Sequence, residues 1–167
     1  KRGKDSEIKQ PTLLILSTLE DNNYPQYVKL HTLTNYKGEP IEEYLKEKCL
    51  FDPTIVINCD RDKAFFCLNK LAQLENSVVD YTKENHKLKW LNTFIGNIQS
   101  NINHLYRLVK KRDLPLFLSE QEWRINHRYS GKRIMDKVKK YISMSTPVTF
   151  KQITNSVLAY EKQFLSA

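Results

Sequence analysis

Short apolar segments separated by turn residues make up the first half of the chain. Residues 12–19 and 27–34 are rich in β-branched and apolar residues, and a polar turn separates them, which predicts a β-hairpin. In the second segment Val28, Leu30 and Thr32 alternate with other residues, so we expect them to share one face of the sheet. A proline directly before the first segment would also allow a short helix there.

The pattern then changes to helix, strand and helix. Residues 41–51 predict a short helix that follows a proline and carries acidic residues in its first turn. Its expected inner face consists of Ile41, Tyr44, Leu45 and the aliphatic part of Lys48. Residues 54–59 are β-branched and apolar, which predicts a strand buried on both faces. Residues 60–74 follow as a helix, so this half is expected to run β-β-α-β-α.

The second half is dominated by helical spacing. Apolar residues within 84–112 recur at alternating steps of three and four, which predicts one long helix. These positions are Leu88, Leu91, Ile95, Ile98, Ile102, Leu105 and Val109. Further apolar residues widen this face, which favours a helix in a globular bundle, although a two-stranded coiled coil stays open.

Three further helices are expected after the long one. Pro115 is expected to end the long helix, and Ser119 with Glu122 has the spacing of a capping box that starts the next. The dipeptide Ser130-Gly131 should break that helix. Residues 132–143 predict an amphipathic helix with Ile134, Met135, Val138, Tyr141 and Ile142 on or near its core side. Thr149 can cap a last helix.

These elements predict an α+β fold with a small sheet and two helices in the N-terminal half and a helical bundle in the C-terminal half. We expect a tail over 1–10, an acidic α+β subdomain over 11–83 and a basic helical subdomain over 84–167. The last two helices resemble the opening of a winged-helix unit. The absence of an initial methionine suggests a piece of a longer chain.

Charge separates the two halves. The chain has a net charge of +8. Residues 10–84 carry eight bases and twelve acids, whereas residues 85–167 carry fifteen bases and five acids. Such an asymmetry points to a polyanionic partner for the second half.

The cations concentrate between residues 104 and 140, where aromatic residues are interleaved with them. Lysine and arginine neutralise phosphates, and aromatic rings can stack on exposed bases, so this segment predicts a DNA- or RNA-binding surface. The candidate nucleic-acid-binding residues are Arg107, Lys110, Lys111, Arg112, Arg124, Arg128, Lys132, Arg133, Lys137, Lys139 and Lys140. An acidic protein, lipid headgroups or a solvated surface without a partner are the alternatives.

Two carboxylates are the only candidates for metal chemistry. Asp60 and Asp62 follow the predicted strand at 54–59, at the strand end where α/β sheets bind ligands. Together they could hold Mg²⁺ for phosphoryl transfer, or they could simply cap the next helix. The sequence contains no Walker A, GxGxxG or GxSxG motif, and its four histidines form no metal-binding spacing.

The three cysteines do not form a zinc-binding pattern, and we expect free thiols in a reducing compartment, nuclear or cytoplasmic with nuclear preferred. No segment has the roughly 18 consecutive apolar residues of a membrane span. No cofactor or membrane is expected.

The function expected from these observations is a non-enzymatic module of a larger nuclear assembly that contacts DNA or RNA through its basic helices. One alternative is a protein–protein assembly domain that docks a partner through the long helix or the tyrosine-rich first half. A second alternative is a metal-dependent nuclease or transferase fragment.

Overall fold

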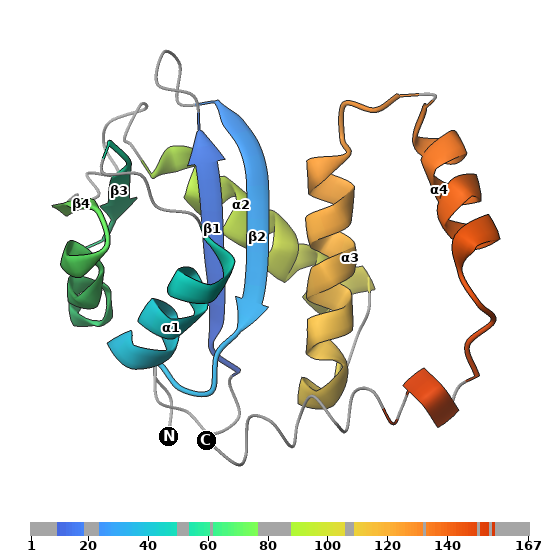
Figure 1. Ribbon diagram of the computed structural model, residues 1–167, viewed down its shortest axis with the longest axis horizontal. Coiled ribbons are helices and arrows are strands. Elements are labelled where there is room, and N and C mark those ends of the chain that lie inside the picture. Colours follow the sequence, from blue (N-terminus) through green and yellow to red (C-terminus); the bar gives the residue numbers. More distant parts are fainter. Residues whose placement is uncertain are drawn as a thin grey trace.

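The fold is mixed α+β, as the sequence predicts: two small β-sheets lie early in the chain and most of the helices follow (Figure 1). This architecture comes from a computed structural model. The structure describes residues 10–18, 24–49, 54–60, 62–76, 88–105, 109–131, 133–149, 151–153 and 155. In this part of the chain, no helix has both the length and the apolarity that crossing a membrane requires.

The predicted hairpin is confirmed. Strands β1 (Thr12–Thr18) and β2 (Pro25–Thr32) pair in antiparallel register. Opposite residues on one face of this sheet are Leu14 with Leu30 and Leu16 with Val28. The shared face expected for Val28, Leu30 and Thr32 is also confirmed, because all three side chains are buried. The alternation of β2 therefore directs one row of residues into the core.

Helix α1 (Gly38–Lys48) covers the opposite face of the hairpin (Figure 1). Its predicted inner residues Ile41 and Leu45 are buried with Leu13 of β1 in one apolar cluster. The ring of Tyr44 stacks on His31 of β2 at 4.0 Å between centroids. The sheet is therefore a middle layer between α1 and the helices that follow later in the chain.

A glycine permits close packing between α1 and the 3₁₀ helix η1 (Lys63–Lys70). A Cβ atom at Gly38 would lie 3.0 Å from the carbonyl oxygen of Ala64, which is tighter than nearly all Cβ contacts in proteins. The thiol of Cys67 donates to the Gly38 carbonyl at 3.3 Å. A larger residue at this position would require its neighbours in η1 to shift by a few tenths of an ångström.

Strand β3 (Val56–Cys59) confirms the predicted strand, but its expected burial on both faces is wrong. β3 pairs in parallel with β4 (Gln73–Asn76). In the described part of the chain β4 is its single neighbour, and the side chain of Val56 is 42% exposed. The helix expected over residues 60–74 is also partly wrong, because the chain forms η1 and then enters β4.

Helix α2 (Lys89–Ser100) occupies the first part of the predicted long helix. A π-helical turn over Asn101–Leu105 extends it, and a separate 3₁₀ turn follows over Lys111–Asp113. The single helix expected over residues 84–112 is therefore wrong. The apolar spacing serves packing against the sheet instead, since Ile98 is buried with Val28 and Leu30.

Helix α3 (Leu114–Asn126) begins where the sequence predicted an end. Pro115 lies in its first turn, a position that needs no amide hydrogen and suits the fixed φ angle of proline. Ser119 lies inside the helix and donates to the Pro115 carbonyl at 2.9 Å, so the expected capping box is wrong. Leu118 is 2% exposed and joins the core beneath the hairpin.

Side chains of α3 occupy the free edge of β2. Asn126 accepts from the backbone amide of Val28 at 2.8 Å and donates to its carbonyl at 2.9 Å. One turn earlier, Glu122 accepts from the amide of Leu30 at 3.0 Å and from the ammonium of Lys29 at 2.7 Å. These bonds replace those of a neighbouring strand, so α3 closes an edge that would otherwise invite pairing with other chains.

Helix α4 (Arg133–Met144) confirms the amphipathic helix expected over 132–143 and stands apart from α3 (Figure 1). The chain turns between them at Gly131, whose φ of 50° suits glycine. The expected core side of α4 is wrong. None of its residues is buried, and Met135 and Ile142 are 58% and 68% exposed. Thr149 and Gln152 exchange capping hydrogen bonds at the start of the next helical turn, as expected.

Candidate functional site

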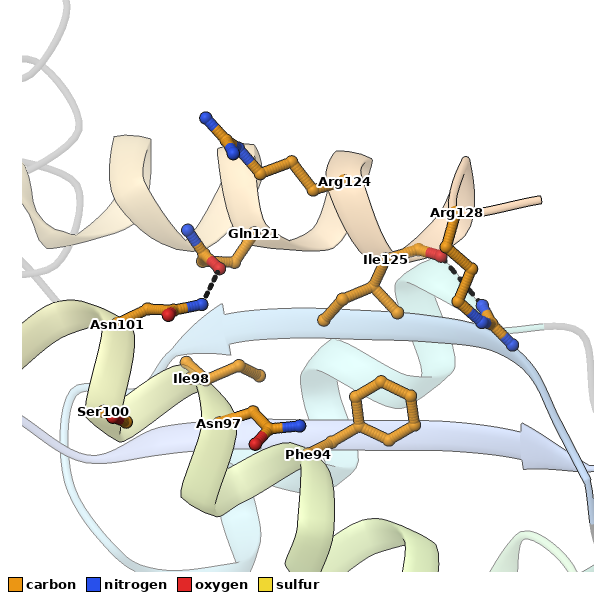
Figure 2. Close-up of a pocket in the computed structure, with 9 residues that line it drawn as sticks. All are labelled: Phe94, Asn97, Ile98, Ser100, Asn101, Gln121, Arg124, Ile125 and Arg128. Carbon is orange, nitrogen blue, oxygen red and sulfur yellow. Dashed lines mark hydrogen bonds between the residues drawn. The ribbon is translucent and has the colours of Figure 1, made fainter. Parts of the chain in front are cut away.

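A groove runs between α2 and α3 on the side of the hairpin opposite α1. Its volume is about 360 Å³, within the range of roughly 300–1,000 Å³ typical of ligand sites. Figure 2 shows Ile98 of α2 and Ile125 of α3 pointing toward each other, with the ring of Phe94 beside them. The remaining lining residues are Asn97, Ser100, Asn101, Gln121, Arg124 and Arg128. Apolar side chains thus form the interior, and polar groups surround it.

Three side-chain amides contribute to the groove wall. Asn101 donates from Nδ2 to Oε1 of Gln121 at 3.0 Å, and this bond links the two helices at one end (Figure 2). Gln121 is only 4% exposed, so the packing of its neighbours fixes it in place. Asn97 lies one turn before Asn101, is exposed, and makes no side-chain hydrogen bond to any described residue. Its amide is therefore available to a ligand as both donor and acceptor.

A tightly held guanidinium marks the other end of the groove. Arg128 donates from Nη1 to the Ile125 carbonyl at 2.8 Å and to the Gln26 carbonyl at 3.4 Å. Its Nη2 donates to the carbonyl of Pro25. These bonds fix the end of α3 to the start of β2. A positive charge is thus fixed at this end of the groove while most of its donors are committed to the backbone.

Beyond Arg128 lies an aromatic cluster of Tyr24, Trp90 and Tyr129. The Arg128 guanidinium sits 4.5 Å from the centroid of the Tyr129 ring. Tyr24 packs edge-on against Trp90 at 5.4 Å between centroids, and its hydroxyl is hydrogen-bonded to that of Tyr129. The hydrogen bond with Tyr24 and the neighbouring guanidinium of Arg128 lower the pKa of the Tyr129 phenol. Tyr129 is 69% exposed, so an aromatic ring faces solvent beside a cation.

The predicted nucleic-acid-binding residues fall into three places. Lys110, Lys111 and Arg112 lie at the turn before α3, Arg124 and Arg128 lie on or just after α3, and the others described lie on α4. Arg107 and Lys132 lie outside the described residues. The α4 residues are Arg133, Lys137, Lys139 and Lys140, and all four are exposed. The described candidate residues therefore lie at the turn before α3, at the end of α3 and on α4 rather than along one element.

The side chain of Arg124 is more exposed to solvent than that of Arg128. It is 63% exposed and points away from the groove interior over the outer side of α3 (Figure 2). It pairs with Glu120 one turn earlier at 2.7 Å. Exposed pairs of this kind contribute less than about 1 kcal/mol, so a phosphate could replace the carboxylate at little cost.

Asp60 and Asp62 both accept backbone hydrogen bonds before η1, and Asp62, not Asp60, is the N-cap of that helix. Asp60 accepts from the amide of Asp62 at 3.2 Å, and Asp62 accepts from the amide of Ala64 at 3.0 Å at the start of η1. One oxygen of each carboxylate therefore accepts a hydrogen bond from the backbone amide two residues later. Across the described ranges, no group of three or more His, Cys, Asp or Glu side chains is gathered closely enough to hold a metal ion.

The cysteines carry no sign of reactivity. Cys49, Cys59 and Cys67 are free thiols, as expected. Burial is the main influence on all three and raises the pKa of each. Because the thiolate is the nucleophilic form, these thiols are poor nucleophiles near neutral pH.

The groove amides were missed from the sequence. Asn97, Asn101 and Gln121 are polar residues without a local motif, and only the packing of α2 against α3 brings them together. The four-residue spacing of Asn97 and Asn101 on one helix was the available signal. It identifies a shared face only when the helix boundaries are already known.

One comparison with known proteins identifies a family. The profile of the ISXO2-like transposase domain matches residues 1–126, from the start of the chain to the last residue of α3. No curated protein and no solved structure matches the chain. The matched region contains the hairpin and the groove helices, whereas α4 lies outside it.

This match corrects the expected function. A transposase family is a family of DNA-cutting enzymes, so the expectation of a non-enzymatic binding module is wrong, and so is the expectation that the protein is not an enzyme. The alternative of a nuclease or transferase fragment fits the match. Because the profile covers residues 1–126 of 167, the chain belongs to the ISXO2-like transposase domain family.

Proposed function

We propose that this chain acts on DNA as a transposase domain and holds the DNA backbone along a basic side formed by the cations of α4. The observation that carries the proposal is the family match over residues 1–126. DNA carries a dense row of phosphate charges, and proteins that handle it neutralise several of them with lysine and arginine. The cations on this side supply that chemistry.

Helix α4 offers the freest of these cations. This helix carries four cations and a single carboxylate, Asp136. The cations are Arg133, Lys137, Lys139 and Lys140. None of the four makes an ion pair with any residue that the structure describes, and all are exposed. A phosphate approaching α4 therefore displaces water and counterions but no protein carboxylate, which favours binding.

Charge reversal on α4 tests this proposal. We expect K137E/K139E/K140E to weaken binding to a short DNA duplex at least about tenfold and to lower the salt dependence by roughly three phosphate contacts. The measurement is a fluorescence-anisotropy titration at several salt concentrations. α4 buries none of its residues, so this variant should keep its fold.

A matched control separates a local contact from overall charge. K37E/K63E/K70E makes the same change in net charge at three exposed lysines of the first half. The proposal predicts little loss of affinity for this control. If both triple variants lose affinity equally, or if the α4 variant loses none, α4 is not the DNA-binding surface.

A second candidate places phosphoryl transfer at the end of β3. The parallel pairing of β3 with β4 brings Cys59 beside Asn76, and Asp60 follows directly at this strand end. Asp60 with Asp62 would hold a divalent ion, which supplies a Lewis acid for attack on a phosphodiester. Further ligands would have to come from other residues, since the described part of the chain gathers no third one.

Nicking of supercoiled DNA with and without Mg²⁺ tests this candidate. If Asp60 is a ligand, D60N should abolish Mg²⁺-dependent nicking while leaving DNA affinity unchanged. The control is E39Q, which removes the charge of an exposed carboxylate in the first turn of α1 and should leave nicking unchanged. Nicking by D60N at the wild-type rate would rule out this role.

A further inference from the structure

Resting on the proposed function, we propose that the groove between α2 and α3 accepts an unpaired DNA base and that Tyr129 provides a stacking surface beside it. The groove and the aromatic cluster meet at Arg128, which lines the groove and also lies against the Tyr129 ring. The two features therefore form one continuous surface. Its chemistry matches a base more closely than a phosphate alone.

The aromatic part fits the flat face of a base. Every base has a π face, and exposed aromatic rings beside arginine are a common platform for single strands. Tyr24 is 38% exposed and Tyr129 is 69% exposed, so both rings can be reached from solvent. Their shared hydrogen bond and the contact with Arg128 hold the Tyr129 ring in place. A fixed ring loses little freedom when a base stacks on it.

The groove fits the edge of a base. Phe94, Ile98 and Ile125 present apolar surface, while Asn97 presents a free amide at the same opening (Figure 2). Asparagine can donate and accept at once, which is how side chains read base edges. In a duplex the pairing edges are occupied by the opposite strand. Only an unpaired or extruded base can therefore enter such a groove.

Charge favours a nucleic acid as the occupant. The fixed guanidinium of Arg128 stands at one end of the groove, and the exposed Arg124 lies on the outer side of α3. The strand that carries the base would place its phosphates near these cations. Glu120 is the acidic group paired with Arg124, and it is partly exposed and can be displaced.

The test compares two DNA duplexes that differ by one unpaired adenine. We expect the wild-type protein to bind the duplex with the unpaired base roughly tenfold more tightly, the effect of one stacked base. N97L should fill the opening and remove this preference while leaving affinity for the paired duplex unchanged. Y129A should reduce the preference through a different residue, in case N97L disturbs the fold.

Controls and outcomes keep this inference separate from the proposed function. N69L makes the same change at an exposed asparagine of η1 and should preserve the preference. Replacement of the unpaired adenine by 2-aminopurine should give fluorescence that is quenched on binding. Equal affinity of the wild type for both duplexes, or a preference that survives N97L and Y129A, would overturn the groove proposal alone. Failure to bind either duplex would overturn the proposed function as well.

Discussion

At the scale of single residues, His31 links the burial of a side chain to the pH dependence of stability. It lies on the α1 side of the hairpin and stacks on Tyr44. Burial lowers its pKa and outweighs the attraction of Glu47, while Lys48 and Lys29 lower the pKa further. The folded protein therefore prefers the neutral ring.

The sign of the pH effect follows from this shift. In the unfolded chain a histidine takes up a proton near pH 6.5, whereas folded His31 needs a lower pH. The unfolded state then binds more protons below about pH 6.5, so the free energy of unfolding should fall as the pH drops through that range. Urea unfolding between pH 5 and 8 measures it.

Replacement of His31 by glutamine isolates this contribution. H31Q should remove part of the loss of stability below about pH 6.5. Above pH 7.5 the wild-type and variant curves should run parallel. If the two proteins lose stability equally on acidification, His31 is not the titrating group.

At the scale of elements, α3 is held to the edge of β2 by hydrogen bonds from its side chains to the strand backbone. Asn126 alone satisfies both the amide and the carbonyl of Val28. Removal of its side chain leaves these partly buried groups without partners, which costs about 1–3 kcal/mol. We therefore expect N126A to lower the free energy of unfolding by about 2 kcal/mol in urea denaturation.

The control lies two residues earlier on the same helix. R124A removes an exposed side chain with a solvent-screened ion pair, so its effect should stay within about 0.5 kcal/mol. Equal destabilisation by N126A and R124A would mean that the edge bonds do not hold α3 in place.

Elements with a local signal could be predicted from the sequence. The alternation in β2 identified its buried face, and Gly131 marked the break before α4 because it needs a left-handed backbone. The sequence Gln-Leu-Glu-Asn of β4 has little strand propensity, and parallel pairing with β3 imposes its conformation. Pro115 was misleading because proline suits a first turn as well as an end.

The candidate site could be predicted only in its charge. Basic residues are visible as a composition bias, and α4 appeared near its expected boundaries. The groove depends on α2 packing against α3, about 20 residues away, as the contact of Asn101 with Gln121 shows. The spacing of apolar residues continues past Ser100, but packing on the sheet determined where α2 gives way to the π-helical turn. Long-range contacts of this kind leave no local pattern.

At the scale of the whole molecule, the residues that match the family profile include all those that form the packed core. The matched residues 1–126 end where α3 completes the edge of β2, and the two apolar clusters lie on either side of the hairpin within this range. Helix α4 follows outside the match with an apolar and a basic face, neither of them buried. The structural core therefore lies in the matched region, and much of the exposed positive charge lies on the helix beyond it.

The measurement that tests the central claim most directly is the affinity of the wild-type protein for a short DNA duplex at about 50 and 200 mM salt. A protein that makes several phosphate contacts loses orders of magnitude in affinity between these conditions, and we predict such a loss here. Absence of binding at the lower salt concentration, or binding that does not change with salt, would contradict the claim that this chain holds DNA through its basic side.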